Sequence, residues 1–154
     1  MKFSTREDLE VPIDRVFEAL SEFETFERLA IRRGVDVRRT DTLRSPGVGA
    51  RWHARFVMRG KTRDLELELT EYDQPTRMRF DSVSPSLSGR LDLELVALST
   101  KRTRMIIGID MRPKTLAARL LVQSLKFAKT NLDKRFKLRV ADYVKDMERR
   151  LRDV

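Results

Sequence analysis

The stretch RWHARFVMRGKTRDLELEL, residues 51–69, decides the fold of this chain. Apolar residues occupy every second position on both sides of a short polar segment at 59–61: Trp52, Ala54, Phe56 and Met58 before it, and Leu65, Leu67 and Leu69 after it. A period of two predicts a strand with one apolar and one polar face. Because Gly60 suits a tight chain reversal, the two runs are predicted to pair antiparallel.

The same period extends outward from this stretch, over residues 35–112. Further apolar runs of one parity are Val35 and Val37; Met78 and Phe80; Leu91, Leu93, Leu95 and Ala97; and Met105, Ile107, Ile109 and Met111. The opposite parity is mostly charged, and segments containing Gly, Pro or Ser separate the runs. We therefore predict six consecutive antiparallel strands, with a dry and a wet face, preceded by a strand over 3–11.

Helical spacing of apolar residues appears on either side of these strands. It predicts two short helices over 13–20 and 23–30. After Pro113 the chain has no further Gly or Pro, and an apolar stripe runs from Leu121 to Leu151. This pattern predicts one terminal helix of up to ~40 residues, beginning at Pro113 and bent or frayed along its roughly 60 Å length.

Composition narrows the class of protein. A length of 154 residues fits one domain, 1–154. The absence of cysteine excludes disulfides, thiolate nucleophiles and cysteine metal sites. The charged first ten residues and the lack of a long apolar run predict neither a secretory signal nor a membrane span. We expect a soluble cytoplasmic protein.

The only histidine and the only tryptophan are neighbours, His53 and Trp52. Strand parity places Trp52 on the dry face and His53 on the wet face, so His53 is expected to be a neutral, solvated surface residue rather than a catalytic base. The inward parity of the strands from residue 51 onward contains no Asp, Glu, His, Lys or Arg. We therefore predict no catalytic residues, no metal site and no cofactor there.

Two earlier strands depart from this rule. On the first strand the parity of Phe3 and Leu9 includes Glu7, and on the second strand the inward parity includes Arg39 and Asp41. If the two strands are neighbours, Glu7 and Arg39 could form an ion pair at the rim of the apolar face or anchor the polar head of a ligand. A rim salt bridge without function, or exposure at the strand ends, is the alternative.

Three segments resemble the START, polyketide cyclase and birch-pollen-allergen superfamily, SRPBCC, which has the helix-grip fold. They are LEVPIDRVFEALSEFETFERLAI (9–31), RSPGVGARWHARF (44–56) and LTEYDQPTRMRFDS (69–82). The resemblance implies an α+β fold in which a strongly curved seven-stranded antiparallel sheet wraps around a long C-terminal helix, with two short helices between strands 1 and 2. It also implies an internal cavity for a hydrophobic ligand, and adjacent first and second strands that would bring Glu7 to Arg39.

The predicted cavity lining combines the inward parity of the strands with one side of the terminal helix. It consists of Trp52, Phe56, Met58, Leu67, Leu69, Met78, Phe80, Leu93, Met105, Ile107, Ile109, Leu121, Leu125 and Phe136. Ligand pockets are mostly apolar in this way, and methionines adapt to guests of different shape. A filled core without a cavity is the alternative, which residue types alone leave open.

These observations favour a noncatalytic carrier or sensor for a lipid, an isoprenoid or a polyketide-like aromatic. The alternative is a cyclase, dehydratase or hydrolase of the same superfamily that uses loop residues together with Glu7, Arg39 or Asp41. A second alternative arises from charge, since residues 113–154 carry 12 Lys and Arg against 5 Asp and Glu. Such a basic helix could bind an anionic membrane, a ribosome or RNA.

The terminal helix also carries apolar residues roughly opposite its core stripe: Leu116, Leu120, Phe127 and Leu138. Beside basic residues, such a patch could make a transient contact with an anionic membrane or form a weak homodimer, although a monomer with a solvated basic face is equally compatible. No specific nucleic acid is expected, because, apart from Phe127, the wet face lacks aromatic residues beside the basic ones on which bases could stack.

Overall fold

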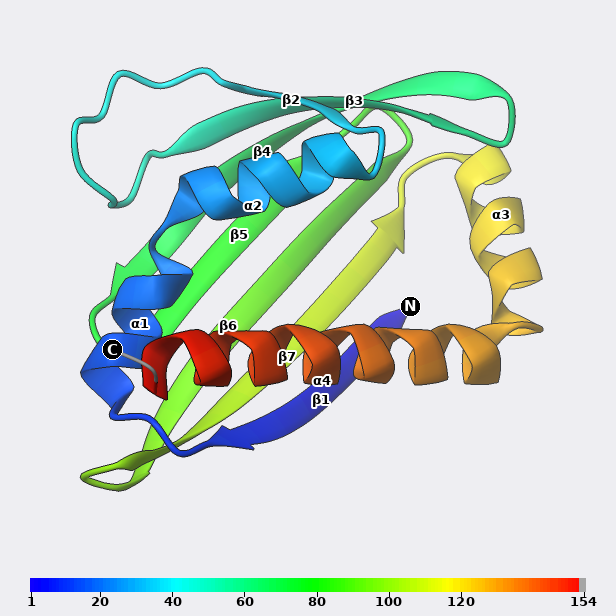
Figure 1. Cartoon of the computed structure of the whole chain (residues 1–154). Coiled ribbons are helices and arrows are strands. Elements are labelled where there is room, and N and C mark those ends of the chain that lie inside the picture. Colours follow the sequence, from blue (N-terminus) through cyan, green and yellow to red (C-terminus); the bar gives the residue numbers. More distant parts are fainter. Residues whose placement is uncertain (153–154) are drawn as a thin grey trace.

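The computed structural model describes residues 1–152, which form a curved sheet and four helices (Figure 1). The last two residues of the predicted 1–154 domain lie outside the described residues. The elements are β1 (Lys2–Leu9), α1 (Ile13–Leu20), α2 (Phe23–Arg32), β2 (Asp36–Arg39), β3 (Arg51–Met58), β4 (Lys61–Asp73), β5 (Arg77–Val83), β6 (Leu87–Ser99), β7 (Arg102–Pro113), α3 (Leu116–Lys126) and α4 (Lys129–Arg152). The predicted seven strands and the two short helices after β1 are confirmed.

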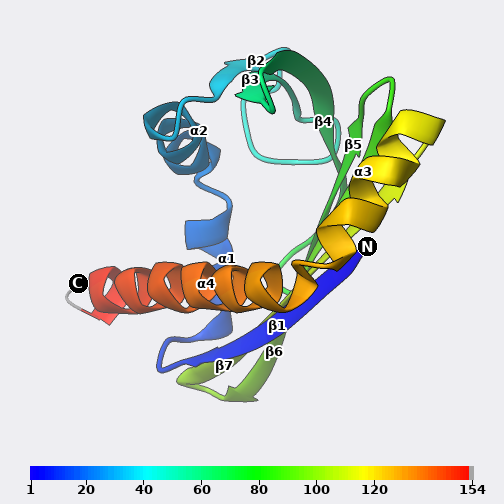
Figure 2. The same ribbon diagram turned by 90° about the vertical axis from the view of Figure 1, so that its right-hand side faces the viewer.

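All strand pairs are antiparallel, and the order across the sheet is β1-β7-β6-β5-β4-β3-β2. Its concave face is turned toward α2 and α4, as the side view shows (Figure 2). Since β1 and β2 form opposite edges, the expectation that they are adjacent is wrong. The two short helices between them carry the chain from one edge to the other.

The β3–β4 hairpin explains why the register predicted from sequence holds. Arg59 and Gly60 both have a positive φ, 53° and 73°, which makes a two-residue turn whose twist matches that of the flanking strands. Trp52 consequently pairs with Leu67, and the apolar parity of β3 continues on β4.

Because β4 already begins at Lys61, the inward parity also includes Arg63, so the expectation that it contains no charged residue is wrong for this strand.

The convex face of the sheet carries ion pairs between neighbouring strands, as the alternation of charges predicts. The closest nitrogen–oxygen distances are 2.6 Å for Arg51–Glu68, 2.7 Å for Arg79–Asp92, 2.8 Å for Arg90–Asp81 and 2.8 Å for Arg104–Asp8. The hydrogen bond from Arg104 lowers the pKa of Asp8. Burial raises the pKa of Asp81, but the hydrogen bonds from Thr70 and then Arg90 outweigh it and lower that pKa overall. The polar parity therefore remains in solvent, and the opposite parity faces the helices.

His53 lies on this convex face as predicted, but it is not a free, solvated ring. Its Nδ1 atom is 2.5 Å from Glu66 Oε1, and its Nε2 atom is 2.9 Å from Asp64 Oδ1. Hydrogen bonding to Glu66 and then to Asp64 raises the pKa of His53. The expectation of a freely solvated ring is therefore wrong, and the two carboxylates on β4 favour its protonated form.

We expect NMR titration of the His53 ring to give a pKa above the ordinary histidine value of about 6.5. Replacing both carboxylates, in Asp64→Asn with Glu66→Gln, should return it toward that value. Since the folded-state pKa is the higher one, this interaction stabilises the fold below the unfolded-state pKa and is lost as pH rises through the folded-state pKa. An unchanged titration in the double variant would show that the carboxylates do not control the ring.

One end of the concave face is filled by a continuous apolar core. α1 contributes Val16, Phe17 and Leu20, and the second half of α4 contributes Val144 and Met147. They pack against buried residues of the sheet, namely Leu9, Trp52, Leu69, Met78, Phe80, Leu93, Leu95 and Met105. Burial of these side chains holds α1 and α4 against the sheet.

The C-terminal segment differs from the single helix predicted from Pro113. β7 continues through Pro113, Thr115 caps α3 by accepting a hydrogen bond from the Ala118 N–H at 3.1 Å, and the chain turns at 127–128 before α4. α3 buries Ala118 and Val122 near the end of β7, whereas α4 packs across β1 in a different direction (Figure 1). No Gly or Pro marks this break, because tertiary packing rather than local propensity produces it.

No helix within residues 1–152 is both long enough and apolar enough to cross a membrane.

Candidate ligand-binding cleft

The part of the concave face that α1 does not cover forms an apolar cleft between α2 and α4. Leu67, Leu91 and Ile107 point from the sheet into this cleft, and each remains only half-buried. Apolar side chains on the interior face of a sheet are ordinarily covered by other parts of the chain. The structure therefore has an interior surface that its own residues leave partly open.

A first pocket of about 250 Å³ lies beneath α2. Its lining consists of Phe23, Phe26, Glu27, Ala30, Val35, Val37, Trp52, Ala54 and Leu67. The Trp52 ring meets Phe23 edge-to-face at 5.3 Å, and the Trp52 Nε1–H donates to Glu27 Oε1 at 3.0 Å. The indole is thus held in place, with its polar atom already satisfied.

A second pocket of about 290 Å³ lies against α4. It is lined by Leu20, Phe26, Leu91, Leu93, Met105, Ile107, Phe136, Arg139, Val140 and Tyr143. Phe26 lines both this pocket and the first one, and its ring lies 5.6 Å from that of Tyr143. The two pockets are therefore adjacent, with Phe26 between them.

A third pocket, of about 310 Å³, lies at the α3 end of the sheet. The β3–β4 hairpin, the β5–β6 turn and α3 form its walls, with Phe56, Met58, Thr62, Arg63, Asp64, Leu65, Ser84, Pro85, Ser86, Leu87, Ala118 and Leu121. Its lining is more polar than that of the first two. Arg63 donates from Nε to the Met58 carbonyl at 3.3 Å, so its charge lies at the edge of this pocket.

A larger hollow, about 520 Å³, opens between α2 and the second half of α4. Thr25, Leu29, Tyr143, Asp146, Arg149 and Arg150 line it. Three of its six lining residues are charged and it opens widely to solvent, so it would cover an apolar guest poorly despite its size. Tyr143 also lines the second pocket, so this hollow adjoins the apolar cleft and provides an opening toward solvent.

Nine of the fourteen predicted lining residues border one of the first three pockets. They are Trp52, Leu67, Leu93, Met105, Ile107, Phe136, Phe56, Met58 and Leu121. Leu69, Met78 and Phe80 are instead buried in the core. Ile109 and Leu125 are half-buried and border none of these pockets. Whether a ligand contacts the bordering residues remains a prediction.

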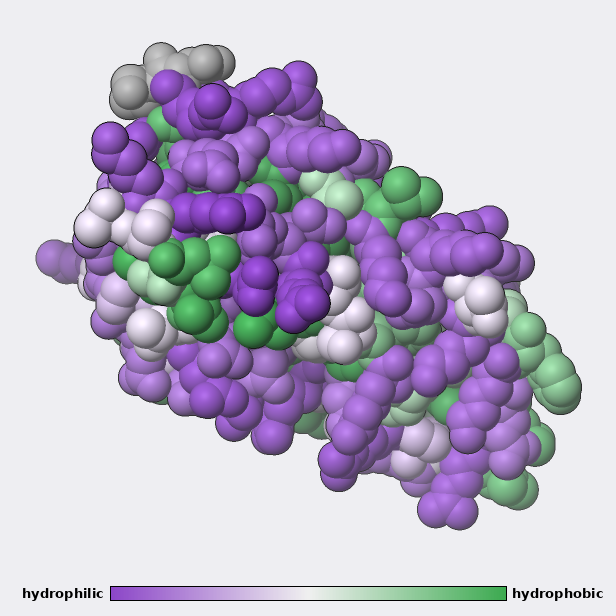
Figure 3. All heavy atoms as spheres, turned by 90° about the horizontal axis from the view of Figure 1, so that it is seen from below, coloured by the Kyte–Doolittle hydropathy of each residue, from purple (hydrophilic) through white to green (hydrophobic). Residues whose placement is uncertain are grey.

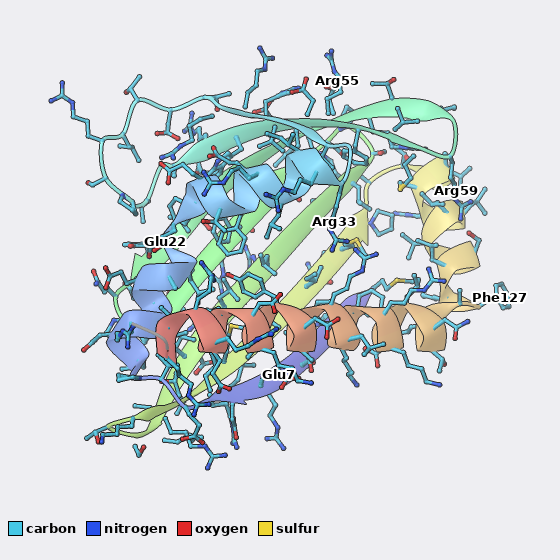
Figure 4. The ribbon with its side chains drawn as sticks, in the orientation of Figure 1. Glu7, Glu22, Arg33, Arg55, Arg59 and Phe127 are labelled. Atoms are coloured by element: carbon cyan, nitrogen blue, oxygen red, sulfur yellow. The ribbon has the colours of Figure 1, made fainter. Side chains whose placement is uncertain are left out.

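The predicted pairing of Glu7 with Arg39 is wrong, because their strands form opposite edges of the sheet. Glu7 lies opposite Met105 in the pairing of β1 with β7, and it is seen beside α4 (Figure 4). The Arg39 guanidinium lies 5.0 Å from the Trp52 ring and forms an ion pair with Asp41. The sheet therefore separates the two residues that were expected to share a polar site.

Asp41 has a structural position rather than a catalytic one. Its carboxylate bonds to the Arg39 side chain and accepts the backbone N–H groups of Leu43 at 2.9 Å and Arg51 at 2.7 Å. The Arg39 side chain and these N–H groups hold the pKa of Asp41 well below its usual range. A carboxylate so strongly stabilised as an anion is a weak base.

Several cleft residues were not among those predicted from sequence. Phe23 and Phe26 come from α2, and Arg139 and Tyr143 come from α4. The apolar stripes of these two helices were visible in the sequence, but they do not show which helix residues border the cleft. Within residues 1–152 no group of three or more His, Asp or Glu side chains is arranged to hold a metal ion.

Tyr143 offers the most distinctive polar group of the cleft, and burial raises its pKa to about 12. We expect absorbance titration to show one tyrosine ionising near pH 12, and this phase should disappear in Tyr143→Phe. Because the folded-state pKa exceeds the unfolded one, the associated stability is lost as pH rises from about 10 toward the folded-state value. Ionisation of Tyr143 near pH 10 would contradict the burial of this phenol.

The family model for "polyketide cyclase / dehydrase and lipid transport" matches residues 1–148. The chain belongs to this family. The SRPBCC resemblance of the three sequence segments is thereby confirmed, as is the helix-grip fold. A search of curated protein sequences gives no match to the chain.

Solved structures with the same fold cover nearly the whole chain. TTHA0849 from Thermus thermophilus has a TM-score of 0.66 at 16% identity, over 98% of this chain and 97% of that one. The Zhui aromatase/cyclase from Streptomyces sp. R1128 has a TM-score of 0.65 at 11% identity, over 97% and 94%. A START superfamily protein from Mycobacterium smegmatis has a TM-score of 0.56 at 10% identity, over 87% and 95%. At such identities the likeness concerns the fold.

Proposed function

We propose that this member of the family binds a small hydrophobic molecule, such as a lipid, an isoprenoid or a polyketide-like aromatic, in the cleft between α2 and α4 and acts as its carrier or sensor in the cytoplasm. The observation that carries the proposal is the row of half-buried apolar residues Leu67, Leu91 and Ile107 on the interior face of the sheet. A guest that covers these three side chains removes their apolar surface from water, and this hydrophobic burial favours binding.

The size of the cleft supports a guest of moderate length. Ligand pockets are typically about 300–1,000 Å³, and the first two pockets each lie just below that range. Because they meet at Phe26, a guest that spans both has enough room when this ring moves aside. The polar residues along the second pocket are few, namely Arg139 and Tyr143. A guest with an apolar body and a single polar end fits this lining.

The enzyme alternative receives less support from the geometry. Of the residues expected to serve it, Glu7 and Arg39 lie on opposite edges of the sheet, and Asp41 is committed to the turn after β2. The carboxylate of the first pocket, Glu27, accepts the Trp52 N–H and lacks a neighbouring basic partner among the described salt bridges. A binding function needs only the apolar lining of the cleft, whereas a cyclase or dehydratase would also need catalytic side chains placed together there. The geometry therefore favours a binding protein.

Native mass spectrometry of freshly purified protein tests this function. We expect a fraction of the molecules to carry an adduct of low mass that organic solvent extracts, and we expect the stripped protein to take up hydrophobic fluorescent probes at one site. Protein that is free of adducts and takes up no such probe would contradict the proposal. Time-dependent conversion of an extracted adduct by the purified protein would instead favour the enzyme.

A further inference from the structure

We propose that α3 docks the protein on an anionic membrane surface, with Leu116, Leu120 and Phe127 inserted among the lipids and the neighbouring basic residues against their phosphates. This surface lies outside the cleft, so the inference goes beyond the ligand-binding function and does not depend on it.

α3 is amphipathic, but its second apolar face points away from the protein. Ala118 and Val122 are buried, whereas Leu116, Leu120 and Phe127 are 73%, 59% and 95% exposed. Positions 116, 120 and 127 fall along one side of the helix at helical spacing. The exposed row therefore follows the length of α3 and ends at the turn before α4.

The figures show how this row lies on the molecule. Phe127 projects outward from the turn between α3 and α4, far from the cleft (Figure 4). In the space-filling view from below, hydrophobic atoms protrude among hydrophilic ones at the right-hand end, where α3 lies (Figure 3). Because these side chains project from the end of the molecule, they can enter a lipid interface without any rearrangement of the sheet.

The charge along this stretch of the chain has a single sign. Residues 111–132 contain five basic residues, Arg112, Lys114, Arg119, Lys126 and Lys129, and no acidic ones. Within residues 1–152, Arg119, Lys126 and Lys129 form no salt bridge, so their charges remain available. An amphipathic helix with exposed apolar residues beside unpaired cations is typical of proteins that bind at an anionic lipid interface.

A second copy of the chain is a poorer partner for this surface. Two-fold pairing through α3 would place the same basic residues of both copies against one another, which costs electrostatic free energy. Three projecting side chains also fall well short of the ~800 Å² per partner that a stable interface buries. Nucleic acid is a poorer partner as well, because two of the three side chains are leucines, which cannot stack on bases.

The inner face of the same helix borders the third pocket. Ala118 and Leu121 of α3 line that pocket together with Met58 of the β3–β4 hairpin. Arg59, at the tip of the hairpin, is exposed at the same end of the molecule (Figure 4). Docking through α3 would therefore bring the third pocket, at the α3 end of the concave face, close to the lipid surface.

Vesicle co-sedimentation of the full chain tests the proposal. We expect binding to vesicles of phosphatidylcholine mixed with phosphatidylglycerol, little binding to phosphatidylcholine alone, and loss of binding at high salt. Phe127→Ser should weaken binding about tenfold, and the double variant Lys126→Gln, Lys129→Gln about 30-fold at low salt. All of these residues are exposed, so the circular dichroism and melting temperature of the variants should match those of the parent.

Matched controls separate a defined surface from a general attraction between charges. Val48→Ser removes an exposed apolar residue from the β2–β3 loop, at the opposite end of the molecule from α3 (Figure 1). The double variant Arg44→Gln, Lys145→Gln lowers the net charge by the same amount elsewhere. Both should bind like the parent. Equal losses in the controls, no vesicle binding at low salt, or a dimer that Phe127→Ser dissociates would overturn the proposal.

Discussion

Replacing Phe17 by alanine is expected to lower the free energy of unfolding by about 3–5 kcal/mol. Phe17 is 1% exposed in α1, where its ring lies 5.1 Å from that of Tyr72 on β4. The substitution removes the aromatic group that ties α1 to the sheet, and it leaves a cavity that neighbours fill only in part. Since small domains are stable by roughly 5–15 kcal/mol in total, this loss is a large fraction of the stability of the fold.

Urea unfolding followed by circular dichroism measures this loss, and the same substitution at a second phenylalanine provides the control. Phe127 is 95% exposed, so Phe127→Ala should change the unfolding free energy by no more than about 0.5 kcal/mol. A comparable loss in both variants would mean that burial in the core beside α1 does not determine the stability. A loss below about 1 kcal/mol for Phe17→Ala would contradict the packing of α1 directly.

Replacing Ile107 by aspartate should reduce the affinity for a hydrophobic guest by about 100-fold or more. Ile107 lies on β7 at the floor of the second pocket. In the empty cleft the new carboxylate can remain hydrated, whereas a bound guest would strip that water away without offering a hydrogen bond. Titration of the stripped protein with a fluorescent hydrophobic probe measures the change.

Ile106→Asp is the matched control for this experiment. Ile106 is the preceding residue of the same strand and is also half-buried, but its side chain points to the convex face. Both variants place the same charge on β7 and should lose similar β-sheet propensity. Normal probe affinity in Ile106→Asp together with the loss in Ile107→Asp locates the guest on the concave face. Equal affinities in the two variants would exclude the second pocket as the site.

Much of the fold could be predicted from sequence because alternation constrains it directly. Where Trp52, Phe56, Leu67 and Leu69 share a parity, a shift of one residue in register would expose all of them, so the pairing of β3 with β4 has one stable solution. The same reasoning placed His53 on the wet face correctly. It did not reveal the hydrogen bonds of His53 to Asp64 and Glu66, because parity shows the face and not the cross-strand partner.

The arrangement of the helices could not be predicted to the same degree. The break between α3 and α4 lacks a local signal, and it depends on the separate surfaces that Val122 and Val140 bury. The pairing of Glu7 with Arg39 failed for a related reason, since strand order is a property of the whole sheet. For the cleft, sequence identified apolar inward residues correctly. It could not distinguish Met78, which is sealed in the core, from Ile107, which remains open.

The most direct test of the central claim is a methyl NMR spectrum of the stripped protein, recorded while a hydrophobic guest is added. We expect the methyl signals of Leu67, Leu91 and Ile107 to shift and saturate together, while those of Val48 and Val57, which are exposed outside the cleft, stay in place. Saturable shifts confined to Val48, Val57 or other surface methyls, with the three cleft residues unchanged, would contradict a binding site between α2 and α4.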